Sequence, residues 1–241
     1  LRPSGGGAVL LLASLGLLFF LAAGHLAAFS LWTLAVLLGV LNIGLLYEAS
    51  CGRNPFLALA GLALSWVVLA VWWISAPVLG LLVPALCVMG GLAVLAVGGT
   101  LVAKAQADAN HAELPSTFGA SGLVLGLAGH IFMFPVVAQR SLALPPWPWM
   151  GVLLVLLLAL GAASLYVKKG SVPLLSILLG GLLLAAWLGL SAHSGPWPSV
   201  GLGAGLALAL LGYLFLEGAR RGRVEDGAFP LAAGLGLWFL R

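Results

Sequence analysis

Charged residues are scarce in this chain of 241 residues. Lys and Arg together number ten and Asp and Glu six, so only 7% of the residues carry a charge. Soluble domains carry about 25% charged residues. Hydrophobic residues make up 63% of the chain, and a single domain of this size has too little interior to hide them all from water. The composition therefore excludes a soluble enzyme and a disordered tail.

The residues that hold metals and nucleic acids are also few or scattered. The chain has two cysteines, and Cys51 falls in a predicted turn whereas Cys87 falls inside an apolar run, so we expect no disulfide. His111 lies near Asp108 and Glu113, at a spacing that matches no common metal site. The basic residues occupy separate short loops. The sequence thus predicts no metal, no cofactor and no nucleic-acid partner.

Long apolar runs take the place of these features. A membrane-spanning helix needs about 20 mostly apolar residues, and the runs predict eight such helices. A ninth, near residues 228–240, is cut short at Arg241. We therefore predict an all-α, polytopic transmembrane bundle. Its eight full spans lie near residues 7–24, 31–48, 55–75, 78–102, 119–138, 149–167, 172–191 and 199–217.

The distribution of cations predicts the orientation of the bundle. Alternate connections hold eight of the ten basic residues, and all six acids lie on that same side. Because cytoplasmic loops are enriched in Lys and Arg, we expect a cytoplasmic N-terminus. Six tryptophans map to the predicted outer ends, where indole rings favour the headgroup layer; a carbohydrate or haem platform is the alternative interpretation. They are Trp32, Trp72, Trp73, Trp147, Trp149 and Trp197.

Two halves of the chain are similar to each other. Tyr47 and Pro55 recur as Tyr166 and Pro173, at spacings of 119 and 118 residues. This predicts two parallel four-helix repeats. Residues 1–103 form the first unit, 104–118 a cytoplasmic loop, 119–218 the second unit, and 219–241 a basic loop with the partial ninth helix.

A third repeat would start in that partial helix. Because the chain also begins with Leu1, we expect it to be part of a longer array. The alternative is a complete mature protein from which a leader has been removed.

One stretch of the first repeat carries a family resemblance. It runs from Asn42 to Tyr47, passes through a short basic turn, and continues from Phe56 to Leu62 and on to Trp72. This pattern resembles the large bacterial membrane proteins of domain of unknown function 2339, which are long strings of helices with repeated units. The resemblance implies a bacterial inner (plasma) membrane, and it supplies no catalytic residues.

Few polar side chains fall well inside a predicted span, and each is a functional candidate because burial in hydrocarbon is costly. His130 is the only ionisable one, and it is the candidate for a haem or pigment ligand, although a packed neutral histidine is the simpler interpretation. A transport pathway is predicted near Asn42, His130 and Pro135, since prolines break helices at such sites. His25 and His193, at outer helix ends, are alternative axial ligands.

One segment is similar to an enzyme motif. Gly119 to Gly122 resembles the Gly-x-Ser-Gly nucleophile helix of rhomboid intramembrane proteases, with Ser121 as the nucleophile. The serine needs a histidine from another helix as its base. His193 is expected at the opposite membrane face, and His130 is on the serine's own helix, about 13 Å away. We therefore expect no enzyme.

Three functions remain. The first is a non-catalytic subunit or scaffold in a membrane assembly, with lipids and other transmembrane chains as partners. The second is a transporter or channel for a neutral or lipid-like solute. The third is a haem- or pigment-associated redox subunit. The feature that separates the first two is whether Asn42, His130 and Pro135 face a polar cavity or are sealed by their neighbours.

Overall fold

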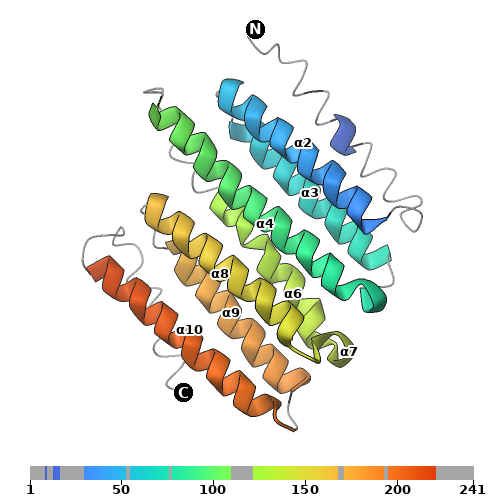
Figure 1. Ribbon diagram of the computed structural model, residues 1–241, viewed down its shortest axis with the longest axis vertical. Coiled ribbons are helices and arrows are strands. Elements are labelled where there is room, and N and C mark those ends of the chain that lie inside the picture. The colour runs from blue at the N-terminus through green and yellow to red at the C-terminus, as the bar shows by residue number, and fades with distance from the viewer. Residues whose placement is uncertain are drawn as a thin grey trace. The chain divides into compact units, whose positions relative to one another are not determined.

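The computed structural model describes residues 9, 13–16, 30–52, 55–75, 78–109, 122–167, 171–192 and 195–220. Nearly all of these residues are helical, and no strand occurs among them (Figure 1). The helices are α2 (Leu31–Gly52), α3 (Pro55–Ser75), α4 (Val78–Ala109), α6 (Ala128–Ala138), α7 (Arg140–Ala143), α8 (Trp147–Val167), α9 (Ser171–Leu190) and α10 (Trp197–Arg220).

Proline marks where several of these helices begin. Pro55 is the first residue of α3, and Pro148, Pro173 and Pro198 lie in the first turns of α8, α9 and α10. The first turn of a helix has no internal acceptor for its N–H groups, so proline is tolerated there and its fixed φ favours the helix. Gly195, at a φ of 72°, forms the turn before α10. Apolar runs with these starting signals therefore fold as separate helices.

Among the described residues, five helices are long and apolar enough to cross a bilayer, which fits a membrane-embedded protein. They coincide with the second, fourth, sixth, seventh and eighth predicted spans, so an all-helical polytopic bundle is confirmed to this extent. The five segments are Leu31–Glu48, Gly80–Val102, Trp147–Ser164, Val172–Leu190 and Trp197–Phe215.

The remaining predicted spans are only partly covered. The third and fifth correspond to shorter apolar helical stretches, Leu59–Ser75 and Gly122–Ala138. Most of the first, at 7–24, and all of the ninth, at 228–240, lie outside the described residues. A total of eight to nine spans stays a prediction.

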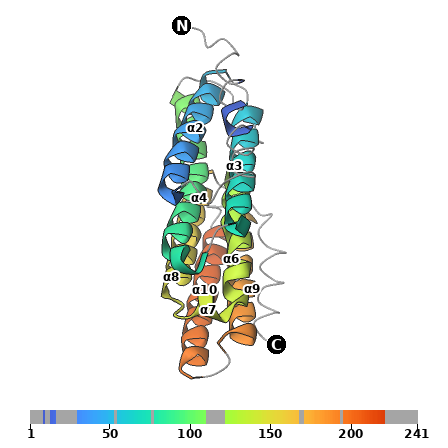
Figure 2. The same ribbon diagram turned by 90° about the vertical axis from the view of Figure 1, so that its right-hand side faces the viewer.

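The chain divides into two compact units, and the first comprises Leu1–Ala128. Within it, α2 packs against both α3 and α4, whereas α3 and α4 touch little. Figure 2 shows α2 and α4 in one layer with α3 in another. Hairpin connections make α2 and α4 parallel, so Glu48 and Lys104 lie toward the same end of this unit.

The second unit comprises Gly129–Arg241, and its central helix is α9, which packs against both α8 and α10. The boundary between the units falls inside the predicted fifth span, where residues 122–126 are helical and Leu127 forms a turn before α6. The predicted second unit starts at residue 119. A four-helix repeat makes the second predicted span equivalent to the sixth. The helix with two extensive partners is α2, the second span, in the first unit, but α9, the seventh span, in the second unit. The parallel repeat stays a prediction.

Within the described ranges two helices carry an internal proline, Pro84 in α4 and Pro135 in α6. Leu81 in α4 has non-helical backbone angles (φ −121°, ψ 15°), three residues before Pro84. Proline has no N–H to donate and its ring crowds the preceding turn, which accounts for a bend at this place. α4 is also the longest helix, with 32 residues, and it continues for a further seven past its apolar segment Gly80–Val102.

A close approach joins the 122–126 helical turn to α4. A Cβ atom built on Gly122 would overlap Thr100 Oγ1 and lie 2.8 Å from Thr100 Cβ. Small residues allow membrane helices to approach in this way. Gly122 therefore fixes where residues 122–126 dock on α4.

Candidate functional site

Seven polar side chains are buried among the described residues. In hydrocarbon a polar group without a hydrogen bond is costly, so the partners of these side chains show what they do. Two bond only within their own helix, Thr100 to Ala96 O and Ser164 to Gly161 O. Ser191, which directly follows α9, donates to Val137 O of α6 at 2.7 Å. The full set is Asn42, Ser65, Thr100, His130, Ser164, Ser176 and Ser191.

Asn42 links α2 to α3 in the first unit. Its Nδ2 donates to Ser65 Oγ at 2.7 Å and to Leu38 O at 2.7 Å, and Ser65 Oγ donates in turn to Gly61 O at 2.8 Å. Asn42 and Ser65 are both completely buried. The arrangement is a short hydrogen-bonded chain that ties two helices together through side chains inside the bundle.

The amide oxygen of Asn42 is an acceptor that this hydrogen-bond network does not use. No described residue donates a hydrogen bond to Asn42 Oδ1. A buried carbonyl oxygen of this kind can accept from a small donor. Because Asn42 itself is completely buried, such a donor has no open route to it from outside the first unit.

His130 links α6 to α9 in the second unit. Its Nε2 lies 2.9 Å from Ser176 Oγ, and both side chains are completely buried. A serine and a histidine at this distance have the geometry of a nucleophile and its base. Catalysis also needs access for a substrate, and neither side chain is exposed. The pair is therefore an interhelical hydrogen bond.

The three predicted pathway residues fall in two different units, so a shared pathway stays a prediction. Asn42 belongs to the first unit, whereas His130 and Pro135 belong to α6 of the second. Within α6, His130 is buried and Pro135 is exposed. Ser65 and Ser176 are the partners that complete each link. In the sequence nothing sets Ser176 apart from the other hydroxyl residues of the apolar runs.

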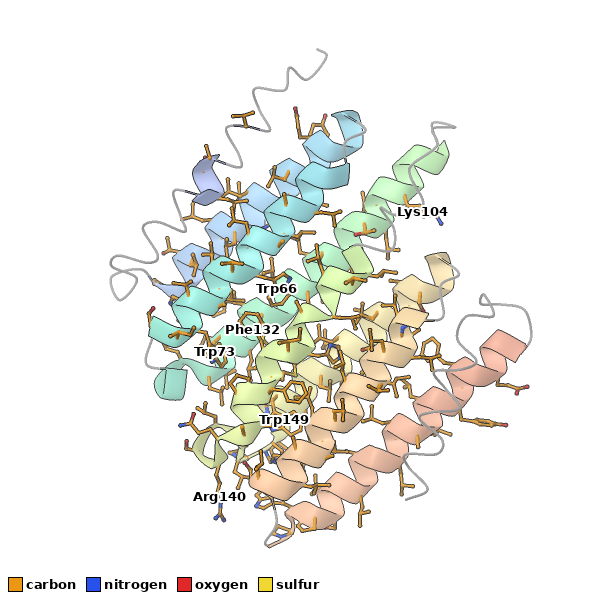
Figure 3. All side chains as sticks on the ribbon, turned by 180° about the vertical axis from the view of Figure 1, so that it is seen from behind. Trp66, Trp73, Lys104, Phe132, Arg140 and Trp149 are labelled. Carbon is orange, nitrogen blue, oxygen red and sulfur yellow. The ribbon has the colours of Figure 1, made fainter. Side chains whose placement is uncertain are left out.

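An aromatic pair in the second unit was also missed from the sequence. Trp149, which is labelled in Figure 3, is completely buried, where the sequence predicts an interfacial ring. Trp187 is completely buried as well. Their ring centres are 5.5 Å apart at 64°, an edge-to-face contact. Trp149 Nε1 donates to Ala143 O at 3.2 Å. Trp72 is buried too, whereas Trp32 and Trp147 are exposed, and their place at the headgroup layer stays a prediction.

Metal and cofactor ligands can be judged only within the described residues. No group of three His, Cys, Asp or Glu side chains gathers there. His130 is held by Ser176, so an axial ligand role through Nε2 requires that this bond be broken. His25, His111, His193 and Ser121 lie outside the described residues.

Comparison with known proteins completes the description of the site. No protein-family model matches the chain, and no curated protein and no solved structure proved significantly similar to it.

Proposed function

We propose that the chain is a non-catalytic subunit or scaffold of a membrane assembly, in the inner membrane of a bacterium. The observation that carries this proposal is the sealing of Asn42 and His130. Both are completely buried, and each is hydrogen-bonded to a serine of a neighbouring helix. Groups that guide a solute or a reaction have to be reachable, whereas groups that hold helices together do not.

A second feature supports a partner helix. Only 11% of the residues in the apolar segment of α10 are buried, against 56% in that of α9. Gly203 and Ala207 are both exposed on α10, and nothing lies within 4 Å of a Cβ placed at Gly203. Two small residues four apart form the surface that membrane helices use for close packing. A helix of another transmembrane chain is the occupant we propose for this face.

Leucines flank the two small residues. Leu202, Leu206, Leu210 and Leu214 are all exposed and follow one another at intervals of four. Side chains at this spacing share one side of a helix. They give the partner helix apolar contacts beside the close approach, where van der Waals packing drives association in lipid.

Native mass spectrometry of the protein extracted from its own membranes in mild detergent tests the proposal. We expect a stable assembly with other chains. Replacing Gly203 with Leu adds bulk where no atom of this chain stands in the way, so it should release the chain from the assembly without unfolding it. Gly151, exposed on α8 and equally open, provides the matched control as Gly151→Leu.

Two results would contradict the subunit role. One is release of the wild-type protein as a lone monomer with no other chain attached. The other is an assembly that tolerates Gly203→Leu as well as it tolerates Gly151→Leu, because the proposed face would then make no contact.

A further inference from the structure

A groove lies between α2 and α4 in the first unit. Its volume is about 220 Å³. The lining is apolar apart from the thiol of Cys87 and the indole N–H of Trp32. The lining residues are Trp32, Ala35, Leu38, Gly39, Cys87, Val88, Gly91, Leu92 and Leu95.

The chemistry of the lining selects an apolar occupant. A thiol is a weak hydrogen-bond donor, and the alkyl side chains offer none. Apolar cavities of about 150 Å³ stay dry and accept hydrocarbon-like molecules. Both helices contain segments long and apolar enough to cross a bilayer, so the groove opens toward hydrocarbon chains.

The groove is too small to enclose a helix. On α4 the lining runs from Cys87 to Leu95, which is about 12 Å along the axis. Over this length a helix, which is about 10 Å across with its side chains, fills roughly 900 Å³. That is several times the volume of the groove. A single extended carbon chain, whose atoms pack at about 3.5–4.0 Å, is narrow enough.

Glycines keep the groove open. Gly39 of α2 and Gly91 of α4 both line it, and a Cβ atom built on either one meets nothing within 4 Å. A larger side chain at these positions would occupy the groove. The space is thus created by missing side chains on two facing helices, and not by a gap in the backbone packing.

Trp32 marks one end of the groove. It lies in the first turn of α2, lines the groove and is 59% exposed. Indole rings at the end of a membrane helix favour the headgroup layer. An occupant with a polar head at the level of Trp32 can therefore extend its chain along Leu38 and Gly91 toward the middle of the membrane.

We propose that the α2–α4 groove holds one straight acyl chain of a membrane phospholipid. This proposal depends on the membrane-embedded helices alone and is independent of the subunit role. It assigns the lipid a defined place on this chain, on a different surface from the exposed face of α10.

Photo-crosslinking of the full chain in vesicles tests the proposal. The probe is a phosphatidylcholine with a diazirine in the middle of one straight acyl chain, and the attachment sites are mapped by mass spectrometry of the digested protein. We expect adducts concentrated at 32–39 and 87–95. Gly91→Leu should lower them by about fivefold or more, the lower end of what overpacking costs. Gly98→Leu, on the same helix, equally open and outside the groove, should leave them unchanged.

Competition separates a fitted groove from general lipid contact. Excess phosphatidylcholine with straight chains should suppress the adducts, whereas phosphatidylcholine with methyl-branched chains, which are too wide, should suppress them poorly. Gly39→Leu repeats the blocking test from the other helix if Gly91→Leu fails to fold. Adducts spread evenly over the apolar surface, equal competition by both lipids, or adducts unchanged in a folded blocking variant would overturn the proposal.

Discussion

Two buried serines of the second unit show how differently the same side chain can act. Ser176 Oγ is hydrogen-bonded to His130 Nε2 on another helix, whereas Ser164 Oγ donates to Gly161 O of its own helix. Both side chains are completely buried. Only the first one contributes to holding helices together. The difference in partner, and not the burial, determines how much each hydroxyl matters for stability.

This difference predicts unequal effects of two matched substitutions. Ser176→Ala removes one of the links between α9 and α6. It should lower the free energy of unfolding by about 0.6 kcal/mol, the average measured for side-chain hydrogen bonds between membrane helices, and by at most about 1.7 kcal/mol. Ser164→Ala removes only a bond within α8 and should cost less. Unfolding in mixed micelles measures both. Equal losses would show that the His130–Ser176 bond contributes nothing beyond packing.

At the residue scale, sequence reasoning located His130 but not its partner. A histidine well inside an apolar run is visible because it is ionisable. Ser176 is one of several hydroxyl residues in the apolar runs, and it lies 46 residues further along the chain. Which serine meets the histidine depends on the rotation of α9 about its axis. The apolar runs carry no strong periodicity that fixes this rotation, because nearly every face of these helices is apolar.

At the scale of the element, the apolar runs located the helices well and their internal breaks poorly. The five long spans follow from uninterrupted runs of sufficient length. The turn at Leu127 does not, because glycines are frequent throughout this chain and those on either side of Leu127 carry no distinct signal. Likewise, α7 is only four residues long, yet its Ala143 carbonyl gives the buried Trp149 a hydrogen-bond partner. A ring that appears interfacial in the sequence is thereby placed in the interior.

The contact between the 122–126 helical turn and α4 leads to a second prediction. Gly122→Ala places a methyl group against Thr100, which is 2% exposed and held to Ala96 O. Because overpacking typically costs about 1–3 kcal/mol, the variant should unfold at a clearly lower temperature. Gly98→Ala adds the same methyl group where nothing lies within 4 Å.

Thermal unfolding monitored by circular dichroism compares the two glycine variants. The Gly98 variant should match the wild type or exceed it, because alanine favours a helix over glycine. If both variants behave alike, the close approach of residues 122–126 to α4 is not maintained in the membrane.

At the scale of the whole molecule, the positions of charge predict which end faces the cytoplasm. Lys104 lies toward the end of α4 and Arg140 begins α7, and each is near an end of its own unit (Figure 3). In the predicted orientation Lys104 is on the cytoplasmic side and Arg140 on the outer side.

Cysteine labelling of intact cells tests this orientation. In a background without Cys51 and Cys87, Arg140→Cys should react with a membrane-impermeant maleimide added outside. Lys104→Cys should react only after the cells are permeabilised. The reverse pattern would place the N-terminus outside. Labelling of both positions from outside would mean that the predicted fifth span, which alone lies between them, does not cross the membrane.

The length of α4 has a consequence for whatever follows it in the chain. Its seven residues beyond Val102 rise about 10 Å, which is more than the roughly 7 Å that headgroups add on each side of the hydrocarbon. The last two turns of the helix therefore act as a rigid spacer. Its last residue, Ala109, is held clear of the lipid surface at a height set by a rigid backbone.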